Sequence, residues 1–261
     1  MKLLFFLFLS AQLFAQQNDS PKVIAIYPSS DSIPVNILRF YIKFSSPMQE
    51  MDILKHIKLT NEEGKNITGV FFENQYELWN DERTEVTLIV DPGRVKLGLL
   101  ANNTMGRAFD IGKTYTLSVD KGLMNFNDQT LEEVFVKKFI AVAEDTIPPK
   151  TEYWNLSLPK ATTDDLLLID FNDKIDHISA TTLIKIFCKN KEIKGEIALD
   201  NKEQRWSFKP DKKWEKGNYQ IIIHPRLEDI AANSVNQIFD HNPADFKPDN
   251  EKNLMINFKT K

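Results

Sequence analysis

The chain repeats one strand pattern at two places, and this repeat constrains its fold more than any other feature. The first copy covers residues 84–123 and the second covers residues 204–227. In each copy, apolar residues alternate with polar ones along two short runs, which is the period of a half-buried β-strand. In both copies eight residues separate a tyrosine from a later leucine: Tyr115 from Leu123, and Tyr219 from Leu227. The repeat predicts that each copy is a β-hairpin and that the chain contains two related β domains.

Length and composition agree with two globular domains. The chain has 261 residues, of which 42% are hydrophobic and 27% are charged, so each half can bury a core. The formal net charge of −4 gives no basic footprint, so no nucleic acid partner is predicted. Cys188 is the only cysteine, so the fold contains no internal disulfide, and this side chain is expected to be a small buried hydrophobe.

The N-terminal segment has the features of a secretory signal. Lys2 precedes an apolar run over residues 3–9, and a short region ends at Ala15. That run is too short for a bilayer, which needs about 20 apolar residues. We therefore expect a signal peptide over residues 1–15, with no transmembrane segment after it, and an exported protein of the periplasm or cell surface. A buried N-terminal strand or an uncleaved anchor remains the alternative.

The expected fold is all-β, with two tandem sandwiches after the signal peptide. The first domain is predicted over residues 21–145 and the second over residues 152–261. Between them, residues 146–151 form a linker that contains the pair Pro148 and Pro149, which restricts its flexibility.

Several short motifs resemble bacterial Ig-like modules of the type found in surface-layer proteins. The sequence F-S-S-P-M occupies residues 44–48, each copy of the repeat has a glycine shortly before its tyrosine, and an L-x-D-x-x-x-N turn covers residues 227–233. The turn is looser in the first half, around residues 125–128. The stretch 78–99 also looks like a narrower group of exported proteins built from two such modules. The resemblance implies Ig-like β-sandwiches and assigns no activity, because this fold hosts unrelated functions.

A loop in the first copy is the main candidate for a binding site. Gly112 lies twenty positions after Pro92, but Gly217 lies only seven positions after Pro210, so the first copy carries an insertion of about thirteen residues. Within the loop over residues 93–111 the basic side chains are Arg94, Lys96 and Arg107. Glycines beside basic side chains can hold a carboxylate or phosphate. The alternative is a solvated loop whose arginines pair with nearby acids.

Tryptophans give the second hypothesis, because aromatic faces bind the apolar faces of sugars. Trp206 and Trp214 are expected in the core. Trp79 and Trp154 are less constrained by the pattern, so a carbohydrate surface would be built on them, although tryptophans are usually largely buried.

Catalytic and metal-binding constellations are weak. The acidic residues near positions 125, 164 and 173 do not have the spacing of a calcium loop, and the four histidines are far apart in the chain. No cofactor is predicted. The sequence predicts a non-catalytic binding or scaffolding protein of the cell envelope, with an envelope protein or an anionic ligand as its partner. A carbohydrate-binding protein is the alternative, and a hydrolase is a more remote one.

Overall fold

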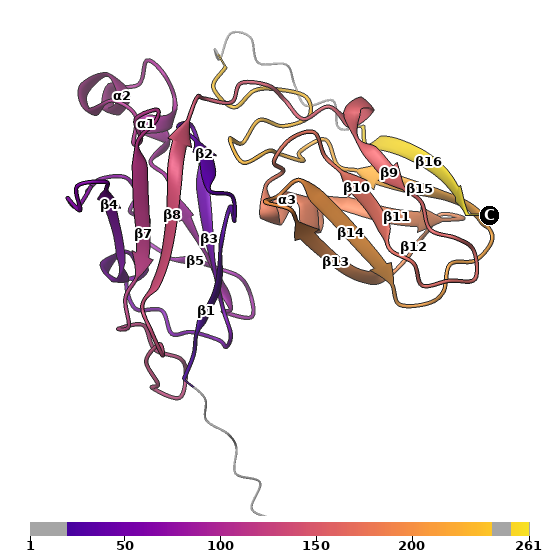
Figure 1. Ribbon diagram of the computed structural model, residues 1–261, viewed down its shortest axis with the longest axis horizontal. Helices are drawn as coiled ribbons and strands as arrows, with labels where there is room; N and C mark the ends of the chain where they lie inside the picture. The colour runs from indigo at the N-terminus through magenta and orange to yellow at the C-terminus, as the bar shows by residue number, and fades with distance from the viewer. Residues whose placement is uncertain (1–19, 242–251, 261) are drawn as a thin grey trace, which may run out of the picture.

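The computed structural model describes residues 20–241 and 252–260, and its strands form two sandwiches side by side (Figure 1). The predicted signal peptide, residues 1–15, lies outside the described residues. In the first domain one sheet has the order β1-β3-β6-β5 and the other has the order β2-β8-β7-β4. Their bounds are β1 (Val23–Tyr27), β2 (Ser32–Pro34), β3 (Arg39–Phe44), β4 (Ile57–Asn61), β5 (Leu78–Trp79), β6 (Glu85–Ile89), β7 (Thr114–Val119) and β8 (Phe135–Val142).

The second domain follows the same plan. One sheet has the order β13-β14-β10-β9 and the other has the order β12-β11-β15-β16. Their bounds are β9 (Asn155–Ser157), β10 (Leu167–Asp170), β11 (Ile184–Cys188), β12 (Lys191–Glu192), β13 (Gly195–Asp200), β14 (Arg205–Pro210), β15 (Gly217–Ile223) and β16 (Leu254–Thr260). The short helices are η1 (Ile53–His56), α1 (Pro92–Val95), α2 (Leu100–Met105), η2 (Thr151–Tyr153) and α3 (His177–Thr182).

The strand order identifies both domains as Ig-like sandwiches. In the Ig fold the first, second, fifth and fourth strands make one sheet, and the third, sixth and seventh make the other. Counted in this way, β1, β3, β6 and β5 form the first sheet, and β4, β7 and β8 form the second, with β2 added in parallel beside β8. The corresponding strands of the second domain pair in the same manner. The all-β prediction is therefore confirmed.

The hairpin prediction is wrong for both copies of the repeat. Strand β6 pairs with β3 and β5, whereas β7 pairs with β4 and β8 in the opposite sheet. Strands β14 and β15 are likewise divided between two sheets. The period-2 pattern shows that a strand has one buried face, but two sheets facing the same core give identical patterns. Each repeat copy is therefore a connection that crosses from one sheet of the sandwich to the other.

The tyrosine of each repeat copy fixes this crossing. At Tyr115 the phenol oxygen accepts a hydrogen bond from the backbone N–H of Asp110 at 2.9 Å. At Tyr219 the hydroxyl lies 3.1 Å from both the N–H and the carbonyl oxygen of Glu215. A tyrosine near the start of the sixth strand that bonds to the backbone just upstream is the tyrosine corner of Ig-like domains. The repeated motif therefore anchors the incoming loop to the strand that follows it.

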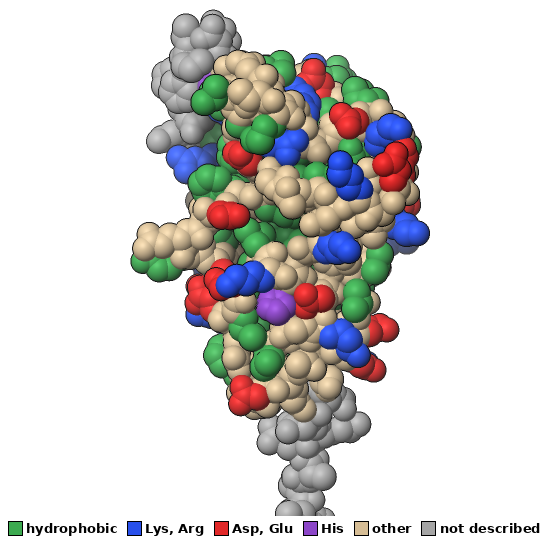
Figure 2. All heavy atoms as spheres, turned by 90° about the vertical axis from the view of Figure 1, so that its left-hand side faces the viewer, with side chains coloured by type: hydrophobic (Ala, Val, Ile, Leu, Met, Phe, Trp, Pro, Cys, Tyr) green, Lys and Arg blue, Asp and Glu red, His purple; other side chains and the backbone are tan. Residues whose placement is uncertain are grey.

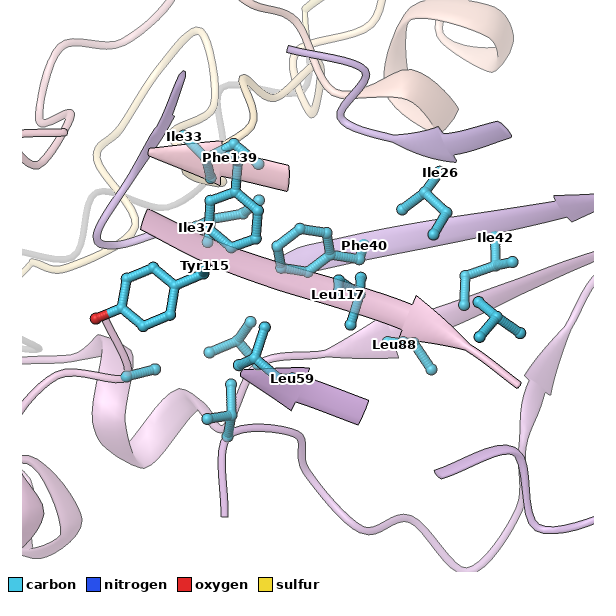
Figure 3. Packing of buried hydrophobic residues seen from close by; sticks show 14 of the residues in the cluster. Ile26, Ile33, Ile37, Phe40, Ile42, Leu59, Leu88, Tyr115, Leu117 and Phe139 are labelled. Atoms are coloured by element: carbon cyan, nitrogen blue, oxygen red, sulfur yellow. The ribbon is translucent and has the colours of Figure 1, made fainter. Parts of the chain in front are cut away.

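Two hydrophobic cores fill the spaces between the sheets. In the first, Phe40 and Phe139 face each other from opposite sheets with ring centroids 5.7 Å apart, and Leu88 and Leu117 extend the contact (Figure 3). The second core is centred on Trp206, whose side chain is fully buried. Predictions that Trp206 and Trp214 lie in the core are confirmed.

The two domains meet through a polar junction. On the outer face of the first sheet, the ring of Tyr27 stacks on that of His177 at the start of α3, with centroids 3.7 Å apart. The hydroxyl of Tyr41 donates to Asp176 at 2.7 Å, and burial raises the pKa of Tyr41, so this donor keeps its proton. Glu203, which is almost fully buried, accepts hydrogen bonds from the backbone N–H groups of Ser29 and Ser30.

Further polar and apolar contacts join the two domains at this junction. Arg39 pairs with Glu228 at 2.6 Å, and Lys174 donates to the carbonyl oxygen of Ser32 at 2.7 Å. Ala232, from the turn after β15, packs into the core of the first domain. Buried hydrogen bonds of this kind depend on geometry, so the junction favours one arrangement of the two domains.

Candidate ligand-binding site

The loop over residues 93–111 is ordered by its own basic side chains. It contains the helices α1 and α2 at one end of the first sandwich (Figure 1). The guanidinium group of Arg94 donates to three carbonyl oxygens, those of Gly106 at 3.1 Å, Gly69 at 3.1 Å and Arg107 at 2.7 Å. Arg94 is only 8% exposed. Arg94 therefore ties the loop to itself and to the segment that contains residue 69.

The other two basic residues of the loop are also engaged. Arg107 donates to the carbonyl oxygen of Val95 at 2.7 Å and forms an ion pair with Glu144. The ammonium group of Lys96 lies 4.4 Å from the ring centre of Phe239. The structure thus brings Arg94 and Arg107 together, with their donors directed at protein oxygens. That this loop binds an anionic ligand or a partner stays a prediction.

Most of the large exposed side chains of the loop are apolar. Its side chains Leu97, Leu99, Leu100 and Met105 are among the exposed large hydrophobic residues of the described chain. On the face of the first domain seen in Figure 2, basic and acidic side chains are interspersed, without a continuous basic surface among the described residues.

The two tryptophans that the sequence suggests as sugar-stacking residues, Trp79 and Trp154, do not expose their ring faces. Trp154 is 6% exposed and packs edge-on against Phe171, with ring centroids 4.7 Å apart, so its expected exposure is corrected. The pattern missed this because β9 is short and the residue lies just before it. Trp79 is half-buried against Phe44, and its indole N–H donates to Glu77 at 2.6 Å.

A concave site lies next to Trp79 in the first domain. It has a volume of about 670 Å³ and is bounded by η1, by residues 72–78 and by β6. The chain leaves the edge of β6 at Phe72, whose N–H donates to Ile89 at 2.8 Å, and returns to it at Leu78, which pairs with Thr87. The intervening residues therefore form the wall of a cavity rather than a continuous strand.

Glu77 connects the wall over residues 72–78 to η1. One of its carboxylate oxygens accepts the backbone N–H of Ile53 in η1, and the other accepts the indole N–H of Trp79. The side chains of Phe72 and Tyr76 are exposed, with Glu73, Asn74 and Gln75 between them. A cavity of a few hundred Å³ with aromatic side chains and a few polar groups is the usual form of a small-molecule site. The arrangement can bind a ligand.

Three carboxylates form a second polar cluster at the domain junction. Their oxygens, on Asp145, Asp173 and Asp229, lie within 4.8 Å of one another. Burial raises the pKa of Asp229 to about 8 and that of Asp173 to about 6; the nearby charge of Asp145 adds to both shifts, and that of Asp173 adds to the shift of Asp229. Oxygen ligands of this kind could hold Ca²⁺, which takes six to eight of them. Asp229, however, already accepts hydrogen bonds from Ala231 and Asn233.

Replacing Asp173 with asparagine is expected to stabilise the protein at alkaline pH. Both raised pKa values mean that the folded state retains protons that the unfolded state has lost, so the free energy of unfolding of the natural protein falls as the pH rises from about 4 to about 8. The substitution removes one of the mutually repelling charges and keeps the acceptor for the N–H of Lys174. We expect a gain on the order of 2 kcal/mol at pH 8 and little change at pH 4.

Urea unfolding at pH 4, 6 and 8 measures this difference. Asp164→Asn is the matched control, because Asp164 is an exposed carboxylate of the same domain. An Asp173→Asn variant whose stability follows that of the natural protein at all three pH values would show that the cluster carries no charge penalty.

The cavity and the carboxylate cluster were both missed by the sequence analysis. The three aspartates lie after β8, β10 and β15, far apart in the chain, so only the fold brings them together. The cavity wall had a local signal, because residues 73–76 are polar and aromatic without a glycine or proline.

Among the described residues, no helix is both long and apolar enough to cross a bilayer. No protein-family model matches the chain, and no curated protein matches it.

Several solved structures share β-rich domains with this chain at low similarity. The S-layer protein SbsC, domains 1–6, is 11% identical with a TM-score of 0.33, and the match covers 94% of this chain and 41% of that one. A fragment of α2-macroglobulin from Escherichia coli is 11% identical with a TM-score of 0.30, covering 79% of this chain and 66% of that one. The titin Ig tandem A164–A165 is 10% identical with a TM-score of 0.24, covering 93% and 98%.

The chain thus spans less than half of the S-layer protein it resembles. Identities and TM-scores this low carry no information about ligands or activity, and the Ig-like assignment depends on the strand order given above.

Proposed function

We propose that this protein is a non-catalytic binding module of the cell envelope, and that its binding site is the cavity beside η1 in the first domain. The observation that carries the proposal is the wall over residues 72–78, which is fixed at both ends and presents exposed aromatic and polar side chains to a space of about 670 Å³. Export is supported by the apolar run over residues 3–9.

The junction supports a role for both domains. The stack of Tyr27 on His177 and the buried Glu203 favour one arrangement of the sandwiches, so the second domain holds the first at a defined angle. Such a body suits a scaffold that presents a binding site at a fixed distance from its point of attachment.

A second candidate site is the loop over residues 93–111. Its exposed leucines, Leu97, Leu99 and Leu100, favour an apolar contact with a partner protein. In this proposal Arg94, Lys96 and Arg107 shape the loop.

Hydrogen exchange distinguishes the two candidates. The purified protein is measured alone and with polysaccharide, protein and lipid fractions of the cell envelope. Slower exchange over residues 50–55 and 72–78 with at least one fraction is expected, because a ligand in the cavity covers these segments. Protection confined to residues 93–111 would show that the loop is the binding site. An exchange pattern that none of the three fractions changes would contradict a binding role.

A further inference from the structure

The side chains that line the cavity define the chemistry of its ligand. Tyr76 is 70% exposed and Phe72 is 46% exposed, which is unusual for large aromatic side chains held by an ordered wall. An aromatic ring offers a flat apolar face, and the hydroxyl of a tyrosine adds a polar edge. A ligand that fits here needs a flat apolar face of its own and must tolerate contact with water.

The polar side chains between Phe72 and Tyr76 further define the ligand that fits the cavity. Asn74 and Gln75 each carry an amide that both donates and accepts hydrogen bonds, and Glu73 adds an acceptor. Neighbouring hydroxyl groups on a ring, which also donate and accept, match such paired groups. A sugar ring combines these hydroxyls at its edge with C–H groups on its face.

The charge of the cavity selects among sugars. Four carboxylates line it, on Glu50, Asp52, Glu73 and Glu77. Glu50 pairs with Arg83 at 3.1 Å and Asp52 with Lys55 at 2.6 Å, so the net negative charge of the cavity comes from Glu73 and Glu77. An anionic ligand would meet this negative field without a free cation to offset it. This charge disfavours uronic acids, sulfated sugars and phosphates relative to a neutral sugar.

The size of the cavity points to more than one sugar unit. Its volume of about 670 Å³ lies within the range of sites for drug-sized ligands, roughly 300–1,000 Å³. The two exposed rings lie at different points of the wall, Phe72 where the chain leaves β6 and Tyr76 near its return. They can therefore contact successive units of one chain.

We propose that the cavity binds a neutral oligosaccharide, with Tyr76 as the stacking surface and Asn74 and Gln75 as partners of the sugar hydroxyls. This inference rests on the proposed binding role of the same cavity. It replaces Trp79, the platform expected from the sequence, because Trp79 is held against Phe44 and Glu77 and supports the wall from behind.

Titration calorimetry of the purified protein with defined sugars tests the inference. The neutral probes are oligomers of glucose, in α and β linkage, and of N-acetylglucosamine; the anionic probe is an oligomer of galacturonate. We expect at least one neutral oligomer to bind. Tyr76→Ala should weaken its binding about tenfold, because it removes the stacking surface, whereas Tyr76→Trp should retain it. Asn74→Ala and Gln75→Ala should weaken it several-fold.

Tyr153→Ala is the matched control, because Tyr153 is an exposed tyrosine of the second domain and its loss should leave binding unchanged. All these side chains are exposed, and circular dichroism checks that each variant is folded. The inference fails if no neutral oligomer binds at millimolar concentration, if only galacturonate binds, or if Tyr76→Ala binds like the natural protein. If hydrogen exchange still shows protection of residues 72–78 by the protein fraction, only the sugar assignment is lost and the binding role stands.

Discussion

Trp206→Ala is expected to lower the free energy of unfolding of the second domain by about 3–5 kcal/mol, the largest effect of any single substitution considered. The side chain is fully buried, stacks on Phe208 with ring centroids 5.9 Å apart, and donates its indole N–H to the carbonyl oxygen of Ala180 at 2.9 Å. Alanine leaves a cavity between the sheets and an unsatisfied carbonyl at the end of α3.

Hydrogen exchange at increasing urea concentration measures this effect strand by strand. The strands β10, β11, β14 and β15 should lose protection at a lower urea concentration than in the natural protein. Tyr153→Ala again serves as the control, because it removes an exposed aromatic side chain from the same domain. Equal stability of the two variants would show that Trp206 is not central to the second core.

Arg94→Ala is expected to cost about 3 kcal/mol and to open the loop over residues 93–111. The substitution removes the donors for three carbonyl oxygens at once, those of Gly69, Gly106 and Arg107. Arg94→Lys should be nearly as damaging, since a single ammonium group cannot reproduce the planar fork of donors. This comparison separates the geometry of the guanidinium group from its charge.

Limited proteolysis reports on the loop directly. A protease that cleaves after leucine and methionine should cut the Arg94→Ala variant at Leu97, Leu100 or Met105 well before it cuts the natural protein. Lys138→Ala is the control, because Lys138 is an exposed basic residue on β8. If the Arg94 variant resists cleavage as the natural protein does, its three hydrogen bonds do not order the loop.

The β class of both domains was predictable because its signals are local, whereas the Ig-like sandwich was implied only by the resemblance of short motifs such as residues 44–48 and 227–233. Alternation along β6, β7, β14 and β15 marks half-buried strands, and Tyr115 and Tyr219 bond to backbone groups only four or five residues upstream. Strand pairing was not predictable from the same alternation, because either sheet of a sandwich offers the same buried face. The same alternation therefore fits a hairpin equally well, although the strands of each repeat copy lie in different sheets.

The turn after the sixth strand shows how one structure can arise from different residues. In the second domain, Asp229 accepts the N–H groups of Ala231 and Asn233. In the first domain, Asn125 accepts those of Asn127 and Gln129 in the corresponding turn. The looser sequence match around residues 125–128 therefore conceals an equivalent hydrogen-bond pattern, since asparagine and aspartate offer the same side-chain acceptor.

The candidate site was harder to predict than the fold. Arg94 is a residue type that often binds anionic ligands. The sequence alone, however, cannot tell whether its N–H donors face a ligand or the chain's own carbonyl groups. The exposure of Tyr76 depends on the path of the chain between Phe72 and Leu78, which is set by their separate pairing with β6. Tertiary contacts of this kind leave no periodic signal.

The parallel pairing of β2 with β8 has a mechanical consequence. Ser32, Ile33 and Pro34 lie beside Ile140, Ala141 and Val142, at opposite ends of the chain that forms the first domain. A force that pulls these ends apart slides the two strands along each other, so their hydrogen bonds bear the load together rather than one after another. In the described part of the second domain, β16 pairs with β15 alone. The first domain therefore has a shear pairing between its two ends that the described residues of the second domain do not show.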